Sequence, residues 1–168
     1  MIDIKKYNVG TYLVLGLSFL NIIFYFMPFV YGKLVESQLS GYDLLLLMFD
    51  PSSATGVGAS LFNDPSMAGM QFSPYGYVIA ILSFLYLCIS FVIIIFCFLD
   101  LMGYRANKKM VSYLAYSLVF VLVVTLLLIV VRSEFTSSAS RGIGLGYGLI
   151  VGLTSSLIMS ILRVLKIK

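Results

Sequence analysis

Four long runs of uncharged, mostly apolar residues occupy most of this chain of 168 residues. They lie at about residues 9–31, 77–99, 110–131 and 142–162. A helix rises about 1.5 Å per residue, so roughly 20 apolar residues cover the ~30 Å hydrocarbon core of a bilayer, and each run reaches that length. We therefore predict an all-α membrane fold, a bundle of four transmembrane helices that forms one domain over residues 1–168.

The composition agrees with a membrane protein. Hydrophobic residues make up 61% of the chain, charged residues make up 11%, and the mean hydropathy is +1.06. A water-soluble domain with this composition could not cover its surface with polar groups. Outside the four runs, the one sizeable piece is an extracellular segment at roughly residues 32–75, between the first and second spans.

The basic residues indicate how the bundle is oriented. Eight of them fall in the N-terminal tail, in the loop after the second span and in the C-terminal tail, which lie on one side of a four-span bundle. They are Lys5, Lys6, Arg105, Lys108, Lys109, Arg163, Lys166 and Lys168. The positive-inside rule then predicts a multi-pass protein of the cell membrane with both termini in the cytoplasm. Because this charge faces anionic lipid headgroups, the net charge of +4 indicates no nucleic-acid partner.

The start of the extracellular segment contains two structural signals. The stretch Phe29–Leu39 mixes β-branched, aromatic and polar residues in rough alternation, which favours a short strand. Ser40-Gly41-Tyr42-Asp43 then matches a capping box, in which Ser40 accepts from a helix amide and Asp43 reaches back. We expect a short helix through residues 44–49, ended by Asp50-Pro51.

This short helix is apolar on nearly all sides. It must therefore lie in the outer membrane interface, pack on the bundle or dock on a partner. We assign an outer interaction segment to Ser40, Tyr42, Asp43, Leu46 and Phe49. The stretch that follows, Ser52–Pro74, is predicted to be an irregular loop or a pair of short strands.

The fourth run has small residues at every fourth position, which predicts a groove for helix packing. They are Gly144, Gly148, Gly152, Ser156 and Ser160. In lipid, such a face lets another helix approach closely enough for backbone packing. The groove could seat the first span of the same chain, which we favour, or a second protein.

Two polar residues, Ser18 and Asn21, lie inside the first run and need buried partners. An interhelical hydrogen bond is the expected role of Asn21, and a ligand contact is the alternative.

Reactive groups are scarce. The chain has no histidine, so haem ligation, histidine-based metal sites and a serine nucleophile with a histidine base are unsupported. Cys88 and Cys97 are nine residues apart within the second span, which puts their α-carbons about 13 Å apart and beyond disulfide reach. Asp100 stands at the cytoplasmic boundary of that span. We expect no enzyme activity, no metal and no cofactor.

The order of these elements resembles the claudin-like four-span architecture. The resemblance lies in an inner N-terminus, a first span, a long outer segment with a strand and a short helix, and three further spans. This chain departs from claudins proper in having neither tryptophan nor an outer cysteine, so junction or pore formation does not carry over. The Ser40-Gly41-Tyr42-Asp43 box and the glycine-rich start of the last span also look like small tetraspan proteins of Gram-positive bacteria.

These features lead to a functional hypothesis. We expect an accessory, assembly or regulatory protein of the membrane. It would bind another membrane protein, or associate with itself, through its outer segment and its small-residue helix face. The alternatives are an immunity or resistance protein against a toxic peptide, and a small transporter or lipid-binding protein. The last would use Asn21, Ser18, Thr125 and the fourth-span serines as a polar path.

Overall fold

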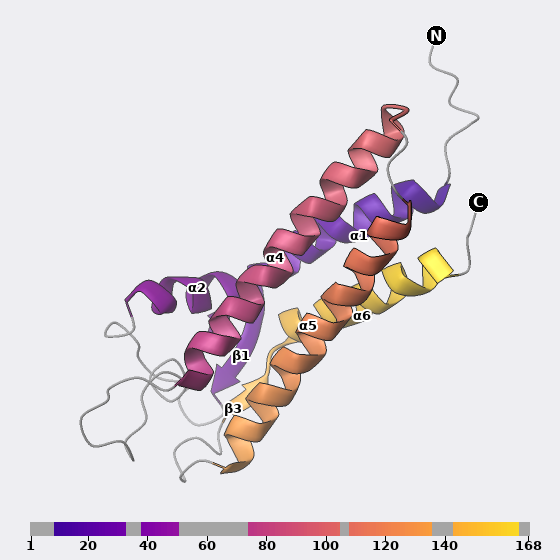
Figure 1. Ribbon diagram of the computed structural model, residues 1–168. Helices are drawn as coiled ribbons and strands as arrows, with labels where there is room; N and C mark the ends of the chain where they lie inside the picture. Colours follow the sequence, from indigo (N-terminus) through magenta and orange to yellow (C-terminus); the bar gives the residue numbers. More distant parts are fainter. Residues whose placement is uncertain (1–8, 33–37, 51–73, 105–107, 136–142, 165–168) are drawn as a thin grey trace.

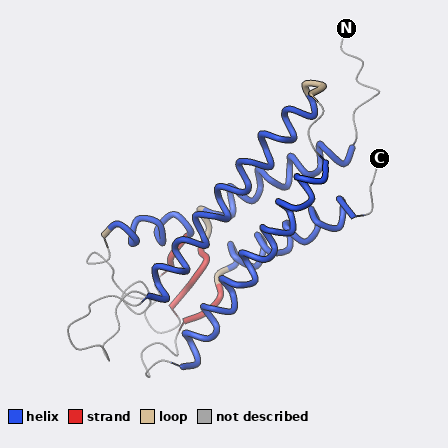
Figure 2. The backbone as a smooth tube through the Cα atoms, viewed as in Figure 1, coloured by secondary structure: helices blue, strands red, loops and turns tan. Residues whose placement is uncertain are grey.

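The computed structural model of the chain is an elongated helical bundle (Figures 1 and 2), formed by four helices. The structure describes residues 9–32, 38–50, 74–104, 108–135 and 143–164. The bundle helices are α1 (Val9–Tyr25), α4 (Pro74–Leu101), α5 (Lys108–Phe135) and α6 (Tyr147–Val164). They contact one another in the cyclic order α1, α4, α5, α6, so each helix packs on two neighbours.

The two ends of the bundle differ. The start of α1, the turn after α4 and the end of α6 lie together at what we call the turn end (Figure 1). The opposite end, which we call the sheet end, holds three short strands and the helix α2 (Gly41–Phe49) (Figure 2). Gly103 makes the turn after α4 with a φ of +86°, a left-handed conformation that glycine adopts without steric cost.

Two of the bundle helices, α4 and α5, are long and apolar enough to cross a membrane, by length and composition. The chain is thus mostly helical, as expected, and the predicted spans 77–99 and 110–131 lie within these two helices. The other two bundle helices are also apolar but shorter, with 17 residues in α1 and 18 in α6.

The first and fourth runs each hold a helix and a strand rather than a helix alone. α1 ends at Tyr25, and β1 (Pro28–Gly32) follows; β3 (Ile143–Leu145) precedes α6. Pro28 cannot continue α1, because proline lacks the amide donor and clashes with the preceding turn. The two strands pair antiparallel, with Val30 opposite Leu145. Packing of the fourth run on the first was the favoured prediction, but the pairing of strands between them was not predicted.

The third strand, β2 (Gln38–Ser40), lies on the other side of β1, so the sheet order is β2-β1-β3. The strand expected over Phe29–Leu39 is therefore two strands, with residues 33–37 outside the described part. α2 starts directly after β2, and its predicted capping box is confirmed. The Asp43 amide donates to Ser40 Oγ at 3.1 Å, and the Ser40 amide donates to Asp43 Oδ2 at 2.8 Å.

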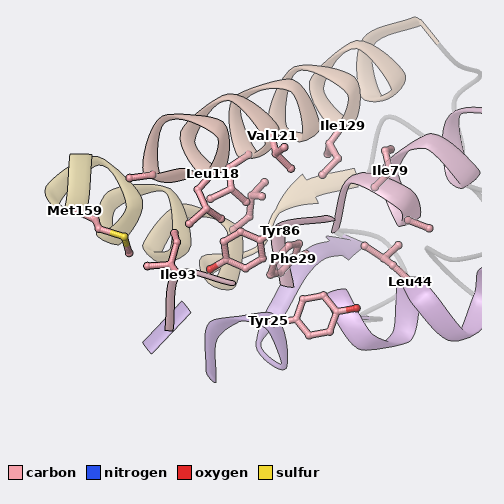
Figure 3. Packing of buried hydrophobic residues seen from close by; sticks show 14 of the residues in the cluster. Tyr25, Phe29, Leu44, Ile79, Tyr86, Ile93, Leu118, Val121, Ile129 and Met159 are labelled. Carbon is pink, nitrogen blue, oxygen red and sulfur yellow. The ribbon is translucent and has the colours of Figure 1, made fainter. Parts of the chain in front are cut away.

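The buried core runs along the bundle and continues under α2 (Figure 3). At the sheet end, the ring of Phe29 packs edge-on against Tyr25 and Tyr86, with centroid distances of 6.1 and 5.9 Å. Leu44 and Leu47 of α2 are buried in the same cluster, and α2 packs on α4. One face of the short apolar helix is thus covered by its own bundle.

Candidate functional site

Asn21 is the centre of a buried polar cluster between α1 and α6. Its side-chain nitrogen donates to Ser156 Oγ at 3.4 Å, and its side-chain oxygen accepts from Ser155 Oγ. Ser156 also donates to the carbonyl oxygen of Gly152, one turn earlier in α6, and the Ser155 hydroxyl shares its single proton between Asn21 Oδ1 and the same carbonyl oxygen. The amide of Asn21 therefore has donor and acceptor partners on another helix, as an interhelical role requires. Ser155 was missed from the sequence because it lies outside the four-residue period of the small residues.

Tyr86 connects α4 to the same cluster. Its hydroxyl donates to the backbone carbonyl oxygen of Asn21 at 3.1 Å. A methyl group at Gly152 would lie 2.9 Å from this hydroxyl oxygen, so the glycine makes room for it. Tyr86 was not predicted as a site residue, because in the sequence it is one aromatic among many in an apolar run.

Most other buried hydroxyls bond within their own helix. Ser18 donates to the Val14 carbonyl at 2.8 Å, and its oxygen lies 3.8 Å from the sulfur of Met159. Thr125 and Ser160 each donate to the carbonyl four residues earlier. These groups therefore have partners inside the chain.

Asp100 has a partner on α1. Thr11 Oγ1 donates to Asp100 Oδ2 at 2.9 Å, which links the start of α1 to the last turn of α4 at the turn end. Cys97 is buried and Cys88 is half-buried on α4, and neither is in a disulfide.

The small-residue face of α6 is covered by the chain itself. A methyl group at Gly148 would lie within 3 Å of the carbonyl oxygens of Met27, Phe24 and Pro28. One at Gly146 would overlap the backbone of Pro28 and Phe29, and one at Gly144 would overlap the ring of Tyr31. The groove therefore seats the end of α1 and the strand β1, the intramolecular alternative that we favoured.

The outer interaction segment divides into two parts. Ser40 and Asp43 bond to each other in the capping box. Tyr42, Leu46 and Phe49 are spaced four and three residues apart, and they expose 44%, 49% and 76% of their surface. We call these three side chains the exposed stripe of α2. The stripe lies opposite the face that packs on α4.

Exposed tyrosines lie at two levels of the described bundle. Those at the sheet end are Tyr31, Tyr42, Tyr75 and Tyr147, and those toward the turn end are Tyr12, Tyr104, Tyr113 and Tyr116. Tyr86, midway along α4, is buried. Between the two levels the exposed large side chains are aliphatic or phenylalanine, as at Phe19, Ile81 and Phe120. Two tyrosine levels that flank an apolar band match the aromatic belts of membrane proteins.

Several predicted residues cannot be placed. Lys5, Lys6, Arg105, Lys166 and Lys168 lie outside the described residues, as do residues 51–73 of the expected Ser52–Pro74 loop. For Lys108 and Arg163 the structure describes the backbone alone, and Lys109 is exposed. Within the described ranges, no group of three or more histidine, cysteine, aspartate or glutamate residues could hold a metal ion.

Comparison with known proteins adds no relative. No protein family, no curated protein and no solved structure matches this chain.

Proposed function

We propose that the chain is a four-span membrane protein with both termini in the cytoplasm, and that it acts by binding rather than by catalysis. In this proposal it is an accessory, assembly or regulatory subunit that associates with another membrane protein at its sheet end. The claudin-like order of elements is part of the same proposal, with the sheet and α2 on the outside. The observation that carries it is the exposed stripe of α2, an ordered apolar surface on a helix fixed to the bundle.

The combined length of α1 and the strand that follows it supports four spans. At ~1.5 Å per helical residue and ~3.3 Å per strand residue, the 17 residues of α1 and the five of β1 extend over about 42 Å. The 28 residues of α4 extend over about the same length. The two short helices are thus each continued by a strand at the sheet end, where β1 and β3 satisfy each other's backbone groups.

The tyrosine levels support the same arrangement. Tyr12 on α1 and Tyr147 on α6 belong to the same two levels as the tyrosines of α4 and α5. A bilayer that fits α4 and α5 would therefore also enclose the exposed aliphatic surface of α1 and α6. The basic residues in the two tails and in the loop after the second span support a cytoplasmic location for the turn end.

The interior favours a binding role over a transport role. Asn21, Ser18, Thr125 and the serines of α6 have hydrogen-bond partners inside the chain, so these groups act in packing in our proposal. The small-residue face is filled by α1 and β1, so we assign partner binding to the sheet end alone. The immunity or resistance alternative would use this same surface, and a killing assay in cells that lack the protein separates it from an accessory role.

Site-specific photocrosslinking tests the proposal. A benzophenone amino acid replaces Leu46 on the exposed stripe in one variant and Phe120, on the lateral face of α5, in a matched control. In native membranes we expect one discrete protein adduct from position 46, with a constant partner, and none from position 120. Adducts with lipid alone from both positions would contradict a protein partner at α2.

A further inference from the structure

α2 has the properties of a helix that lies within a membrane leaflet. We infer that its exposed stripe, Tyr42, Leu46 and Phe49, is immersed in the acyl chains of the leaflet at the sheet end. In the isolated protein the occupant of this surface is then lipid, which the partner of the proposed function would displace. The inference does not require a partner protein, and it would stand if the accessory role proved wrong.

The charge distribution on α2 fits immersion. Asp43 is the one charged side chain between Gly41 and Phe49. Its Oδ2 accepts from the backbone amide and from the hydroxyl of Ser40, at 2.8 and 2.7 Å. The carboxylate is therefore engaged at the start of the helix, away from Leu46 and Phe49. The remaining side chains of α2 are apolar, apart from the Tyr42 hydroxyl, and tyrosine is typical of the interface.

The exposed stripe is continuous with the lateral surface of the bundle. Phe26, which follows α1 and exposes 59% of its surface, contacts Tyr42 with a ring-centroid distance of 5.8 Å. Phe19 and Ile23 of α1 are exposed at helical spacing before it. An uninterrupted apolar surface thus runs from α1 onto α2. Lipid that covers the side of the bundle would reach the stripe without crossing a polar boundary.

The position of α2 along the bundle agrees with this continuity. Figure 1 shows α2 beside the first half of α4 rather than beyond its end, and α5 extends farther in the same direction. α2 packs on α4, one of the two helices long enough to cross a membrane. A bilayer that covers most of α4 therefore also covers the level of α2. Interfacial helices bury their apolar face about 5–10 Å into the boundary of headgroups and acyl chains, which is the depth expected here.

The absence of tryptophan from the chain provides a direct depth measurement. Phe49→Trp and Leu46→Trp each introduce a single tryptophan in the exposed stripe. The purified variants are reconstituted in phosphatidylcholine vesicles whose acyl chains carry bromine, a tryptophan quencher, either near the headgroup or near the chain end. Phe120→Trp, on the exposed mid-length face of α5, is the matched control. A helicity equal to that of the wild type shows that each variant is folded.

Immersion predicts blue-shifted emission for both stripe variants, with stronger quenching by shallow bromine than by deep bromine. The Phe120→Trp control should show the reverse order. Emission at the wavelength of N-acetyl-tryptophanamide in water, with quenching by acrylamide and none by bromolipid, would overturn the inference. So would blue-shifted emission that no bromolipid quenches, because the stripe would then be covered by a second copy of the chain.

Discussion

The buried faces of α5 and α6 pack in the same core but differ in the size and polarity of their side chains. α5 presents bulky apolar residues, including Leu118, Leu122 and Ile129, with Thr125 as a polar exception. α6 presents glycine and serine along most of its buried face, including Gly148, Gly152 and Ser156. The first face fills space with side chains. The second removes side chains so that backbone and polar groups can meet.

This difference follows from how each helix gains its packing contacts. Lipid is as apolar as leucine, so helices in a membrane associate through close packing and hydrogen bonds rather than through the hydrophobic effect. α5 has 28 residues along which to gather packing contacts, whereas α6 has 18. The shorter helix makes closer contacts, in which the backbone of β1 and the amide of Asn21 lie against it. We therefore expect α6 to tolerate added volume far less than α5.

The largest effect should come from filling the small-residue face. The double variant Gly148→Leu and Gly152→Leu would force side chains into the carbonyl oxygens of Met27 and Phe24 and into the Tyr86 hydroxyl. Because the Gly148 contacts are with backbone, the clash there has no cheap relaxation, and we expect loss of the folded bundle. Helicity against SDS mole fraction in mixed micelles measures this. Gly16→Leu is the control, since a methyl group there meets nothing within 4 Å; equal stability of both variants would remove the contrast with α5.

A cavity on α5 should lower the free energy of unfolding by less than the glycine double variant does. Leu118→Ala removes a fully buried side chain and is expected to cost about 2–5 kcal/mol, as in other cores. Leu122→Met conserves volume and should cost less than about 1.5 kcal/mol. The same unfolding titration compares them. If Leu122→Met lowered stability as much as the glycine double variant, α5 and α6 would tolerate changes in side-chain size equally poorly, and the contrast would be wrong.

The polar cluster should contribute an intermediate effect. Asn21→Leu removes the amide that bonds to Ser155 and Ser156, but both serines keep the Gly152 carbonyl. We therefore expect the free energy of unfolding to fall by about 1–3 kcal/mol, with the bundle still folded. A double-mutant cycle with Ser156→Ala isolates the coupling between the two side chains. Additive losses would show that the cluster is not an energetic unit.

The smallest effects should come from two buried tyrosines. Tyr86→Phe removes the hydrogen bond to the backbone carbonyl of Asn21. Side-chain hydrogen bonds in membrane proteins contribute on average about 0.6 kcal/mol to stability. The Tyr25 hydroxyl is buried without a hydrogen-bond partner of good geometry in the described structure. Tyr25→Phe should therefore leave stability unchanged or raise it slightly. The same unfolding titration compares the two variants. A larger loss of stability for Tyr25→Phe than for Tyr86→Phe would show that the Tyr25 hydroxyl does have a stabilising partner.

The sequence predicted local structure well and tertiary pairing poorly. The capping box at Ser40 and Asp43 follows from residues three positions apart, and a local hydrogen-bond pattern can be recognised in one sequence. The spacing of Gly148 and Gly152 indicated close packing, and the first span was the favoured neighbour, but the spacing did not indicate that a strand, β1, would lie there. The presence of that strand depends on the turn before Pro28, which brings β1 alongside α6 and pairs it with β3. No local pattern encodes that pairing.

The candidate surface was predicted only in part. A uniformly apolar helix does not show from its sequence which side faces the bundle. The structure separates the buried Leu44 and Leu47 from the exposed Leu46 and Phe49, because packing on α4 selects one side. The role of Tyr86 was missed for the opposite reason, since one hydroxyl within an apolar run has no partner that can be recognised in the sequence.

The pairing of β1 with β3 has a consequence for biogenesis. The first helix emerges from the ribosome more than a hundred residues before the segment that completes its surroundings. Until then the amide of Asn21 lacks its serines, and the edge of β1 lacks its strand. The nascent chain must therefore hold an unfinished helix during synthesis. The bundle is complete only when β3 and α6 pack against β1 and α1, so a chain that stops before Ile143 leaves the Asn21 amide and one edge of β1 without these partners.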